Sequence, residues 1–264
     1  MEQYKNLFDM SGKNAVVIGG ASGIGQAGAY ALAGIGARVW CADLNQEGAQ
    51  ESADFINQNG GQGHAAQVDI SDANSVNQLL DQVVQEGGSL DAVVATPAIN
   101  VRKPLLDISD EEFAKVLKLN LEGNFYVLRA AGKRMAEQGS GSILAMSSIR
   151  SQTVEPGQGV YAATKSGILQ MVKALAAELG PKGVRVNAIG PGVVETPLTQ
   201  QIKDHPDWYN AYAQKNAFGR WAQASELGGP IAFLCSDAAS YITGTILFVD
   251  AGWTAIDGRF SPPL

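Results

Sequence analysis

Two side chains suited to moving a proton, Tyr161 and Lys165, stand four residues apart in the sequence. Residues at this spacing lie on one face of a helix, one turn apart. A tyrosine with an ordinary pKa of about 10 is a poor base at neutral pH. A neighbouring ammonium favours the phenolate and lowers that pKa. A tyrosine tuned in this way can take the proton of an alcohol, or return one to a carbonyl, as a hydride moves.

Two polar residues upstream complete a candidate catalytic set. Ser148 ends an apolar segment and precedes Tyr161 by 13 residues, so we expect its hydroxyl to orient the substrate oxygen. Asn120 interrupts a helical pattern in which asparagine has poor propensity. We expect Asn120 to hold a water molecule that links Lys165 to solvent.

A glycine-rich turn near the N-terminus predicts a binding site for a dinucleotide. An apolar run at 15–18 leads into the turn, and a helical pattern rich in small residues follows. Glycines permit a tight turn and close approach of the backbone to a pyrophosphate, and the helix N-terminus offers free N–H groups. The candidate contacts are Gly19, Ser22, Gly23, Ile24 and Gly25.

Acidic residues end the next two expected strands. A carboxylate at Asp43 accepts hydrogen bonds from the adenosine ribose and repels a 2′-phosphate. No Lys or Arg stands at Ser22 or at 44–46, so we predict NAD rather than NADP. Asp69 contacts the adenine amino group or, alternatively, caps the following helix.

Apolar, β-branched segments alternate with helical ones and must position these residues. Seven such strands in sustained alternation predict one doubly wound α/β domain with a parallel sheet covered by helices on both faces. Right-handed crossovers bring the strands' carboxyl ends to one edge, where ligands bind. We expect strands at 15–18, 38–43, 65–69, 91–95, 142–146, 184–189 and 245–249. We expect helices at 25–33, 46–58, 73–86, 110–137, 161–179 and 225–235.

Residues 196–221 interrupt this alternation. Five aromatic residues fall within these 26 positions, and we predict a helical lid over the substrate. The alternative is a surface helix pair that buries its aromatics on the domain or on a partner subunit. The tail at 254–264 is expected to be extended and to reach a neighbouring subunit.

These features together resemble the short-chain dehydrogenase/reductase family over nearly the whole of residues 1–264. The family's glycine motif corresponds to Gly19, Gly23 and Gly25, and its catalytic tetrad to Asn120, Ser148, Tyr161 and Lys165. The resemblance implies a single-domain Rossmann-type fold, hydride transfer between NAD(H) and a secondary alcohol or ketone, and a homotetramer. Further implied cofactor contacts are Leu44, Ile70, Tyr161, Lys165, Pro191, Gly192, Val194 and Thr196.

The sequence departs from the family's pattern at two places. Ile18 stands where a threonine usually precedes the first motif glycine. Ala95-Thr96-Pro97-Ala98 replaces the usual Asn-Asn-Ala-Gly. Ala98 lacks glycine's freedom and Pro97 lacks an N–H donor, so the local turn must differ there. No side-chain role is inferred for this segment.

Two arginines suggest the substrate class. Arg102 and Arg150 near the ligand-binding edge can clamp an anionic group or hydrogen-bond several hydroxyls; subunit-interface ion pairs are the alternative. Segment 99–104 resembles that of family members acting on sugar acids and polyols. Ser148, His205 and Trp208 are further candidate substrate contacts.

We therefore expect a small polyol, sugar or sugar-acid-like substrate. One alternative is a reductase of 3-oxoacyl thioesters, on acyl carrier protein or CoA. The other is a nucleotide-sensing protein without turnover, which the presence of both Tyr161 and Lys165 disfavours.

Composition excludes several other classes. The net charge is −7, and no basic cluster suggests a nucleic-acid partner. No apolar run approaches the roughly 18 residues of a transmembrane helix, so we expect a cytoplasmic protein without membrane contacts. The two cysteines are expected to be buried, reduced thiols, and the two histidines are too few and too far apart to suggest a metal site.

Overall fold

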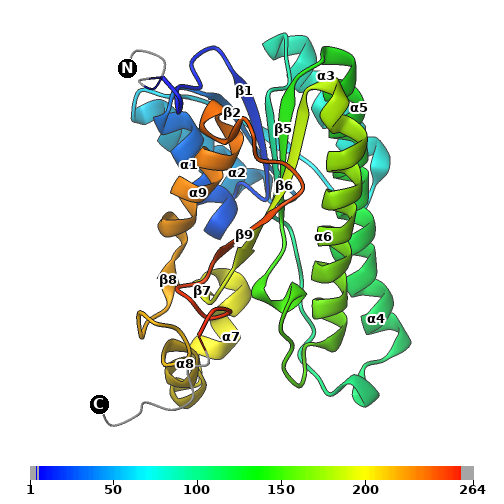
Figure 1. Cartoon of the computed structure of the whole chain (residues 1–264), viewed down its shortest axis with the longest axis vertical. Coiled ribbons are helices and arrows are strands. Elements are labelled where there is room, and N and C mark those ends of the chain that lie inside the picture. The colour runs from blue at the N-terminus through cyan, green and yellow to red at the C-terminus, as the bar shows by residue number, and fades with distance from the viewer. Residues whose placement is uncertain (1–3, 5, 257–264) are drawn as a thin grey trace.

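Apolar strands that are buried on both faces form the centre of the molecule, as Val16, Val17, Val93 and Val94 illustrate with no exposed surface. The computed structural model describes Tyr4 and residues 6–256. Its main sheet is parallel, with strand order β3-β2-β1-β4-β5-β6-β9 (Figure 1). The strands are β1 Asn14–Ile18, β2 Arg38–Asp43, β3 Gln62–Gln67, β4 Ala92–Ala95, β5 Gly141–Met146, β6 Val184–Pro191 and β9 Ile246–Val249.

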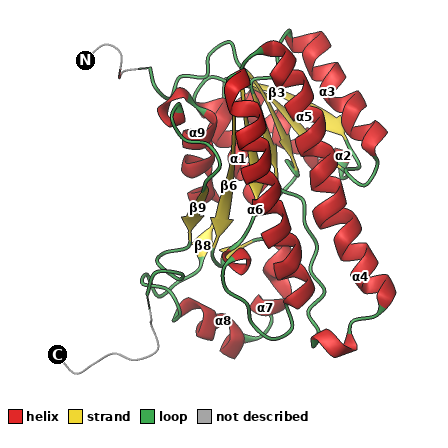
Figure 2. Cartoon of the chain, turned by 45° about the vertical axis from the view of Figure 1, so that its right-hand side comes forward, coloured by secondary structure: helices red, strands yellow, loops and turns green. Residues whose placement is uncertain are grey.

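Helices cover both faces of this sheet (Figures 1 and 2). On one face lie α1 Gly23–Gly34, α2 Gln46–Gln58 and α9 Gly228–Cys235. On the other lie α3 Ala73–Gly87, α5 Asn124–Gln138 and α6 Gly159–Leu179, and α4 Asp110–Leu117 packs beside α6. The predicted doubly wound α/β fold with a seven-stranded parallel sheet is confirmed.

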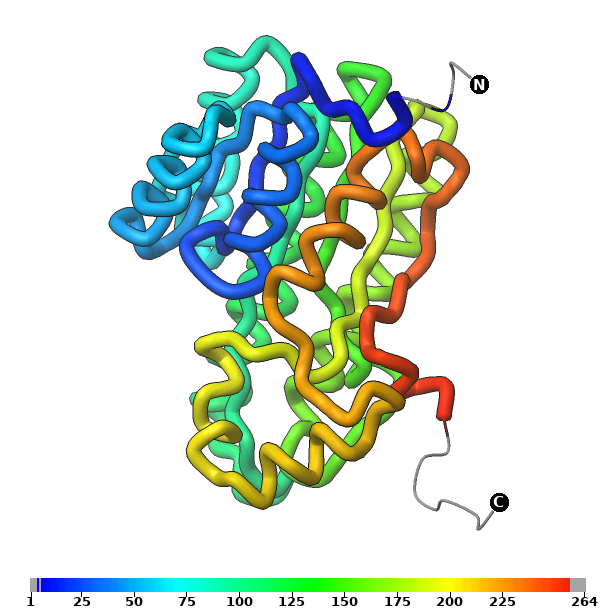
Figure 3. The backbone as a smooth tube through the Cα atoms, turned by 90° about the vertical axis from the view of Figure 1, so that its left-hand side faces the viewer, coloured from blue at the N-terminus to red at the C-terminus, as the bar shows by residue number. Residues whose placement is uncertain are grey.

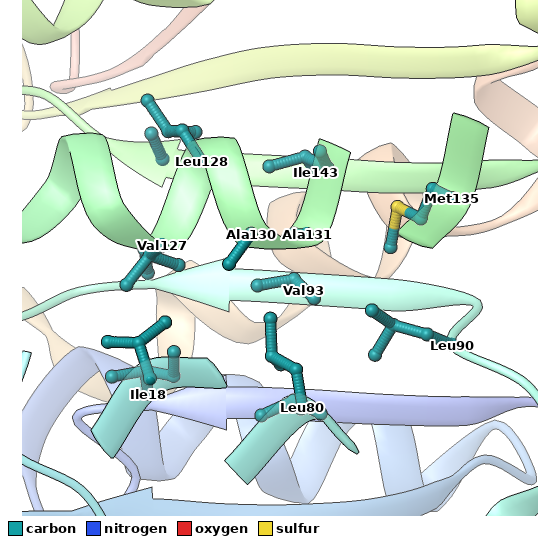
Figure 4. Close-up of a cluster of buried hydrophobic side chains, with 14 of the residues drawn as sticks. Ile18, Leu80, Leu90, Val93, Val127, Leu128, Ala130, Ala131, Met135 and Ile143 are labelled. Atoms are coloured by element: carbon teal, nitrogen blue, oxygen red, sulfur yellow. The ribbon is translucent and has the colours of Figure 1, made fainter. Parts of the chain in front are cut away.

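Aliphatic side chains fill the space between the sheet and the α3–α5–α6 layer. Figure 4 shows Leu80 of α3 and Val127 of α5 pointing toward Ile18 and Val93 of the strands. Burial of each such side chain stabilises the fold by roughly 1.5–3 kcal/mol relative to exposure. This packing holds the carboxyl ends of β1, β4 and β5 in fixed relative positions.

Three expected elements differ from the structure, one of them only at its start, where the expected helix 225–235 begins as a 3-10 turn, Ala224–Leu227, ahead of α9. The third strand spans Gln62–Gln67 and not 65–69, because it is an edge strand of small and polar residues without an apolar signal. The buried Val68, which suggested a strand, follows it in a loop together with the buried Ile70. The expected helix 110–137 is divided into α4 and α5 by a π-helical turn at Lys118–Gly123.

A second, two-stranded sheet was not predicted. β7 Val194–Glu195 pairs in parallel with β8 Ala222–Gln223 and closes the segment that carries α7 Gln200–Lys203 and α8 Pro206–Ala213. Figures 1 and 3 show α7 and α8 beyond the carboxyl ends of the main strands. The segment contains helices, as expected for residues 196–221, and four of its five aromatics pack in one cluster with Ile149 and Trp253, whereas Phe218 is exposed.

The remaining expectations about the structure concern the tail, membrane-spanning helices and metal ligands. Residues 257–264 of the predicted tail lie outside the described residues. Within the described part, no helix is both long enough and apolar enough to cross a membrane. Within the same residues, no group of three or more His, Cys, Asp or Glu could hold a metal ion.

Candidate active site

The turn between β1 and α1 is shaped by glycines. Gly19 and Gly23 have φ of +87° and +56°, in the region that favours glycine. A Cβ on Gly25 would lie 2.0 Å from the carbonyl oxygen of Gly19, so only glycine fits there. Among the described residues, the Ser22 side chain leaves the first N–H groups of α1 uncapped. The helix dipole and these free donors suit a phosphate group.

Asp43 lies at the carboxyl end of β2, as predicted, and faces this turn. Its Oδ2 accepts from the Ala21 N–H at 3.1 Å and its Oδ1 accepts from the Asn45 N–H at 2.9 Å. Asp69 lies two residues beyond β3, and its Oδ1 accepts from both N–H and hydroxyl of Ser71, at 2.8 and 2.7 Å. Asp69 therefore stabilises its own loop while lining the cleft. The alternative that Asp69 caps the next helix is wrong, because Asp72 is the N-cap of α3.

A cleft of about 520 Å³ joins these groups to the candidate catalytic residues. Of the described residues that line it, Lys165 is the only one with a basic side chain. The structure brings together every residue predicted to contact the cofactor: Gly19, Ser22, Gly23, Ile24, Gly25, Asp43, Leu44, Asp69, Ile70, Tyr161, Lys165, Pro191, Gly192, Val194 and Thr196. The glycine turn, the free helix N-terminus and the strand-end carboxylate fit an elongated dinucleotide.

Tyr161 and Lys165 lie in the first two turns of α6 and face the cleft. The Lys165 Nζ lies 5.5 Å from the centre of the Tyr161 ring and donates to the Met146 carbonyl at 2.7 Å. Burial raises the pKa of Tyr161, against the lowering effects of the Ser148 hydroxyl and the charges of Arg102 and Arg150.

Burial also lowers the pKa of Lys165, to about 7. Among the protein's own groups, burial of the phenol outweighs the nearby positive charges, so the lowering of the Tyr161 pKa by Lys165 with a cofactor bound stays a prediction. The lysine is itself 1% exposed and loses much of its preference for the charged form.

Asn120 lies in the π-helical turn and is fully buried. Its Oδ1 accepts from the Ile99 N–H at 2.8 Å, and its Nδ2 donates to the Ile99 carbonyl at 2.8 Å and to the Thr164 hydroxyl at 3.3 Å. The side chain therefore joins the segment after β4 to α6. Its role in holding a water molecule stays a prediction.

Ser148 follows β5 and lines the same cleft. Its Oγ accepts from the Arg150 N–H at 3.1 Å, which fixes the hydroxyl at the start of a short 3-10 turn, Ile149–Ser151. Next to it, the Ser147 hydroxyl donates to the Lys165 carbonyl at 3.0 Å. This hydrogen bond joins the end of β5 to α6, next to the candidate catalytic residues Ser148 and Lys165.

Thr96, in the segment that departs from the family's pattern, binds β4 to β1. Both its N–H and its hydroxyl donate to the Ile18 carbonyl, at 3.0 and 2.9 Å. Its Oγ1 also lies 2.8 Å from where a Cβ on Gly25 would be. Sequence reasoning gave this side chain no role, although a hydroxyl at a strand end is a recognisable signal for such a contact.

The four other candidate substrate residues lie outside the cleft lining among the described residues. Arg150 is buried and pairs with Glu155, Nη2 to Oε2, at 2.8 Å. Arg102 lies with its Cζ 5.5 Å from the centre of the Trp208 ring. His205 is exposed at the start of α8, with its ring centre 6.4 Å from that of Trp208.

Glu155 was missed in the sequence. It accepts from the Tyr212 hydroxyl and from the Gln158 amide, as well as from Arg150. Its place between Ser148 and Tyr161 was the available signal, since a lone carboxylate there is a natural partner for the two arginines.

Comparisons with known proteins agree with this geometry. The family model described as enoyl-(acyl carrier protein) reductase matches residues 19–254. D-Threitol dehydrogenase of Mycolicibacterium smegmatis is 40% identical over 248 residues, covering 94% of this chain and 95% of that protein. Cyclopentanol dehydrogenase of a Comamonas species is 36% identical over 243 residues, covering 92% and 97%.

A similar solved structure is a gluconate 5-dehydrogenase from Burkholderia cenocepacia, in complex with NADP and tartrate. It aligns with a TM-score of 0.91 and 30% identity, covering 95% of this chain and 98% of that one. The chain therefore belongs to the short-chain dehydrogenase/reductase family, and it is an oxidoreductase that acts on a CH–OH group of a small molecule with a nicotinamide cofactor.

Proposed function

We propose that the protein transfers a hydride between NAD(H) and a secondary alcohol, or the matching ketone, of a small polyol, sugar or sugar acid. The observation that carries this proposal is the single cleft that contains the glycine turn, Asp43, Ser148 and Tyr161. The relatives named for threitol, cyclopentanol and gluconate support a small hydroxylated substrate.

Each candidate catalytic residue has a role that its position supports. Tyr161 exchanges the proton of the substrate oxygen, and Ser148 hydrogen-bonds that oxygen. Lys165, buried below the tyrosine, stabilises its phenolate when protonated. Asn120 holds the segment after β4 against α6. The nicotinamide ring, when bound, accepts or donates the hydride.

Asp43 supports NAD as the cofactor. The carboxylate is fixed by two backbone N–H groups at the point where an adenosine ribose would lie. A 2′-phosphate there would face this charge, and Leu44 and Asn45 beside it offer no positive charge in compensation. The Burkholderia gluconate 5-dehydrogenase binds NADP. The preference of this protein for NAD over NADP must therefore be measured.

A second candidate is the reduction of a 3-oxoacyl thioester, which the 32% identity to a 3-oxoacyl-[acyl-carrier-protein] reductase of Escherichia coli supports. Such reductases usually use NADPH, and the Asp43 carboxylate disfavours that cofactor because it repels the 2′-phosphate. An NADPH oxidation assay with an acetoacetyl thioester separates the two.

The direct test is a panel of polyols, sugars and sugar acids with NAD, followed by nicotinamide absorbance. We expect reduction of NAD with at least one of these alcohols, and a smaller kcat/KM with NADP. Turnover of the thioester with NADPH, together with no NAD reduction by any member of the panel, would sink the proposal.

A further inference from the structure

A buried polar cluster beside Tyr161 is centred on the carboxylate of Glu155. Glu155 precedes α6 and accepts hydrogen bonds from the Tyr212 hydroxyl of α8 and the Gln158 amide. Arg150 pairs with its Oε2 at 2.8 Å. One carboxylate therefore joins the loop after β5, the start of α6 and the helix beyond the strand ends.

Arg102 is the member of this cluster whose donors are not satisfied. Its Nη1 lies 3.7 Å from Glu155 Oε1, beyond hydrogen-bond distance. Its Nε and Nη1 are both buried and have no hydrogen-bond partner among the described residues. Two guanidinium groups share one carboxylate here, so positive charge is in excess. A buried cation with unpaired donors is costly, and an incoming anion would relieve that cost.

Arg150, by contrast, has its partners within the protein. It pairs with Glu155, and its Cζ lies 5.9 and 5.6 Å from the ring centres of Tyr212 and Trp253. Its backbone N–H donates to Ser148. Arg150 is thus a positioning residue, and Arg102 is the arginine available to a ligand.

Asn100 adds an unpaired acceptor two residues before Arg102. Because the Glu155 carboxylate only accepts, Gln158 must turn its NH₂ group toward it and its Oε1 away. That Oε1 accepts from Asn100 Nδ2 at 3.1 Å, which fixes the Asn100 amide. Asn100 Oδ1 is then left buried, with no hydrogen-bond partner within the described residues.

The cluster lies next to the reacting end of the cleft. Gln158 precedes Tyr161 by one helical turn, and the backbone of Lys103 lies 3.9 Å from where a Cβ on Gly157 would be. The positive charge of Arg102 opposes the rise that burial causes in the pKa of Tyr161, so the two groups are near enough to interact electrostatically. Trp208 of α8 lies over Arg102, with its ring centre 5.5 Å from the guanidinium carbon, so α8 borders this point of the cluster.

We infer that Asn100 and Arg102 form a substrate subsite for a hydroxy acid. Arg102 binds the carboxylate through its unpaired Nε–H, and Asn100 Oδ1 accepts a hydrogen bond from a hydroxyl that does not react. This inference rests on the proposed function, which places the reacting carbon at Tyr161. It narrows the substrate class from polyols and sugars in general to their acids.

The test measures binding without turnover, because an alcohol cannot react with the reduced cofactor. Calorimetric titrations of the protein loaded with NADH measure the affinity of each ligand. Two pairs with carbon chains of equal length are compared, threonate with threitol and gluconate with glucitol. Both configurations of a ligand are tested where both exist. We expect the acid of at least one pair to bind about 10-fold or more tightly than its neutral partner, the effect of a charge-assisted hydrogen bond. We also expect Arg102→Met to remove this preference.

Two further variants separate the two contacts. Asn100→Leu is expected to weaken the acid and the neutral polyol alike, because both carry the hydroxyl. Arg38→Met removes a half-buried side-chain charge from the amino end of β2, at the opposite end of the strand from Asp43, and is expected to change neither affinity. Thermal unfolding of each variant is measured alongside. Arg102→Met is expected to unfold no earlier than the parent, since the lost guanidinium has unpaired buried donors.

The outcomes for the subsite and for the proposed function are distinct. Equal affinity within both pairs, or a preference for acids that survives in Arg102→Met, overturns the subsite whichever alcohol is oxidised. A preference for acids that Arg102→Met removes supports the subsite, even if no member of the panel reduces NAD and the proposed function fails.

Discussion

At the scale of single residues, Asp43 places one carboxylate between the glycine turn and the loop after β2. Asp43→Asn keeps the shape of this side chain and removes its charge. We expect the ratio of kcat/KM for NAD over NADP to fall about 10-fold or more, because the repulsion of a 2′-phosphate is lost. Initial rates with both cofactors measure this ratio. Glu47→Gln, an exposed acid in the first turn of α2, is the control, and an unchanged ratio in Asp43→Asn would contradict the assignment.

Lys165 gives the stability of the protein a predictable dependence on pH. Its pKa falls from an ordinary 10.5 to about 7, because its burial disfavours the ammonium. Between these two values the unfolded chain binds the proton and the folded chain does not, so this group's contribution to stability rises with pH. Below pH 7 the folded protein carries the full cost of a buried charge.

Lys165→Met removes the buried ammonium, so the difference in stability between variant and parent measures the cost of burying that charge. We expect the variant to gain stability on the order of a few kcal/mol over the parent at pH 6.5 and to lose most of that advantage by about pH 10. Urea unfolding of both proteins across this range measures the difference. Lys173→Met, exposed on the same helix, should show no such trend. A stability difference for Lys165→Met that does not change with pH would contradict the burial argument.

At the scale of elements, the turn from β1 to α1 depends on the absence of side chains. Gly25→Ala forces the new methyl group to within 2.0 Å of the Gly19 carbonyl, so the turn must open. We expect affinity for NADH, measured by fluorescence titration, to fall by more than 10-fold. Gly34→Ala, at the other end of α1, meets no described atom within 4 Å. It should leave affinity unchanged and stabilise the helix by about 0.5–1 kcal/mol. Equal affinities in the two variants would show that the turn does not bind the cofactor.

Local patterns predict most elements and fail where distant contacts decide. The strands with continuous apolar runs were predicted closely, and the edge strand Gln62–Gln67 was displaced because it lacks such a run. The π-helical turn at Lys118–Gly123 was missed. Its Asn120 is held by Ile99, 21 residues away in the sequence, and no local propensity carries that information.

At the scale of the whole molecule, the cleft of the candidate active site was predictable because each of its parts has a local signal. Glycine spacing, a strand-end carboxylate and a tyrosine–lysine pair are all legible in sequence. The arginine cluster was only half predictable. The partners of Glu155 come from α6, α8 and the loop after β5, so its pairing with Arg150 is visible only once these elements are packed together.

Assembly is a further property of the whole molecule, and we predict a homotetramer in solution. Phe113 of α4 and Phe125 of α5 are large apolar side chains with 46% and 42% of their surface exposed. A contiguous apolar patch on a protein surface can mark a contact between subunits, and we propose that α4 and α5 supply one. Light scattering after size exclusion should give the mass of four chains, and Phe125→Glu should lower it. A monomer for the parent protein would contradict this prediction.

The central claim is that Tyr161 exchanges the proton of the substrate oxygen while a hydride moves to or from the nicotinamide. Its most direct test is the kcat of Tyr161→Phe with NAD and the best alcohol of the panel, beside Tyr126→Phe of α5 as the control. We predict a loss of about 10²–10⁴-fold in Tyr161→Phe, near-parental turnover in the control, and unchanged NADH binding in both. Turnover of Tyr161→Phe equal to that of the parent protein would contradict the account.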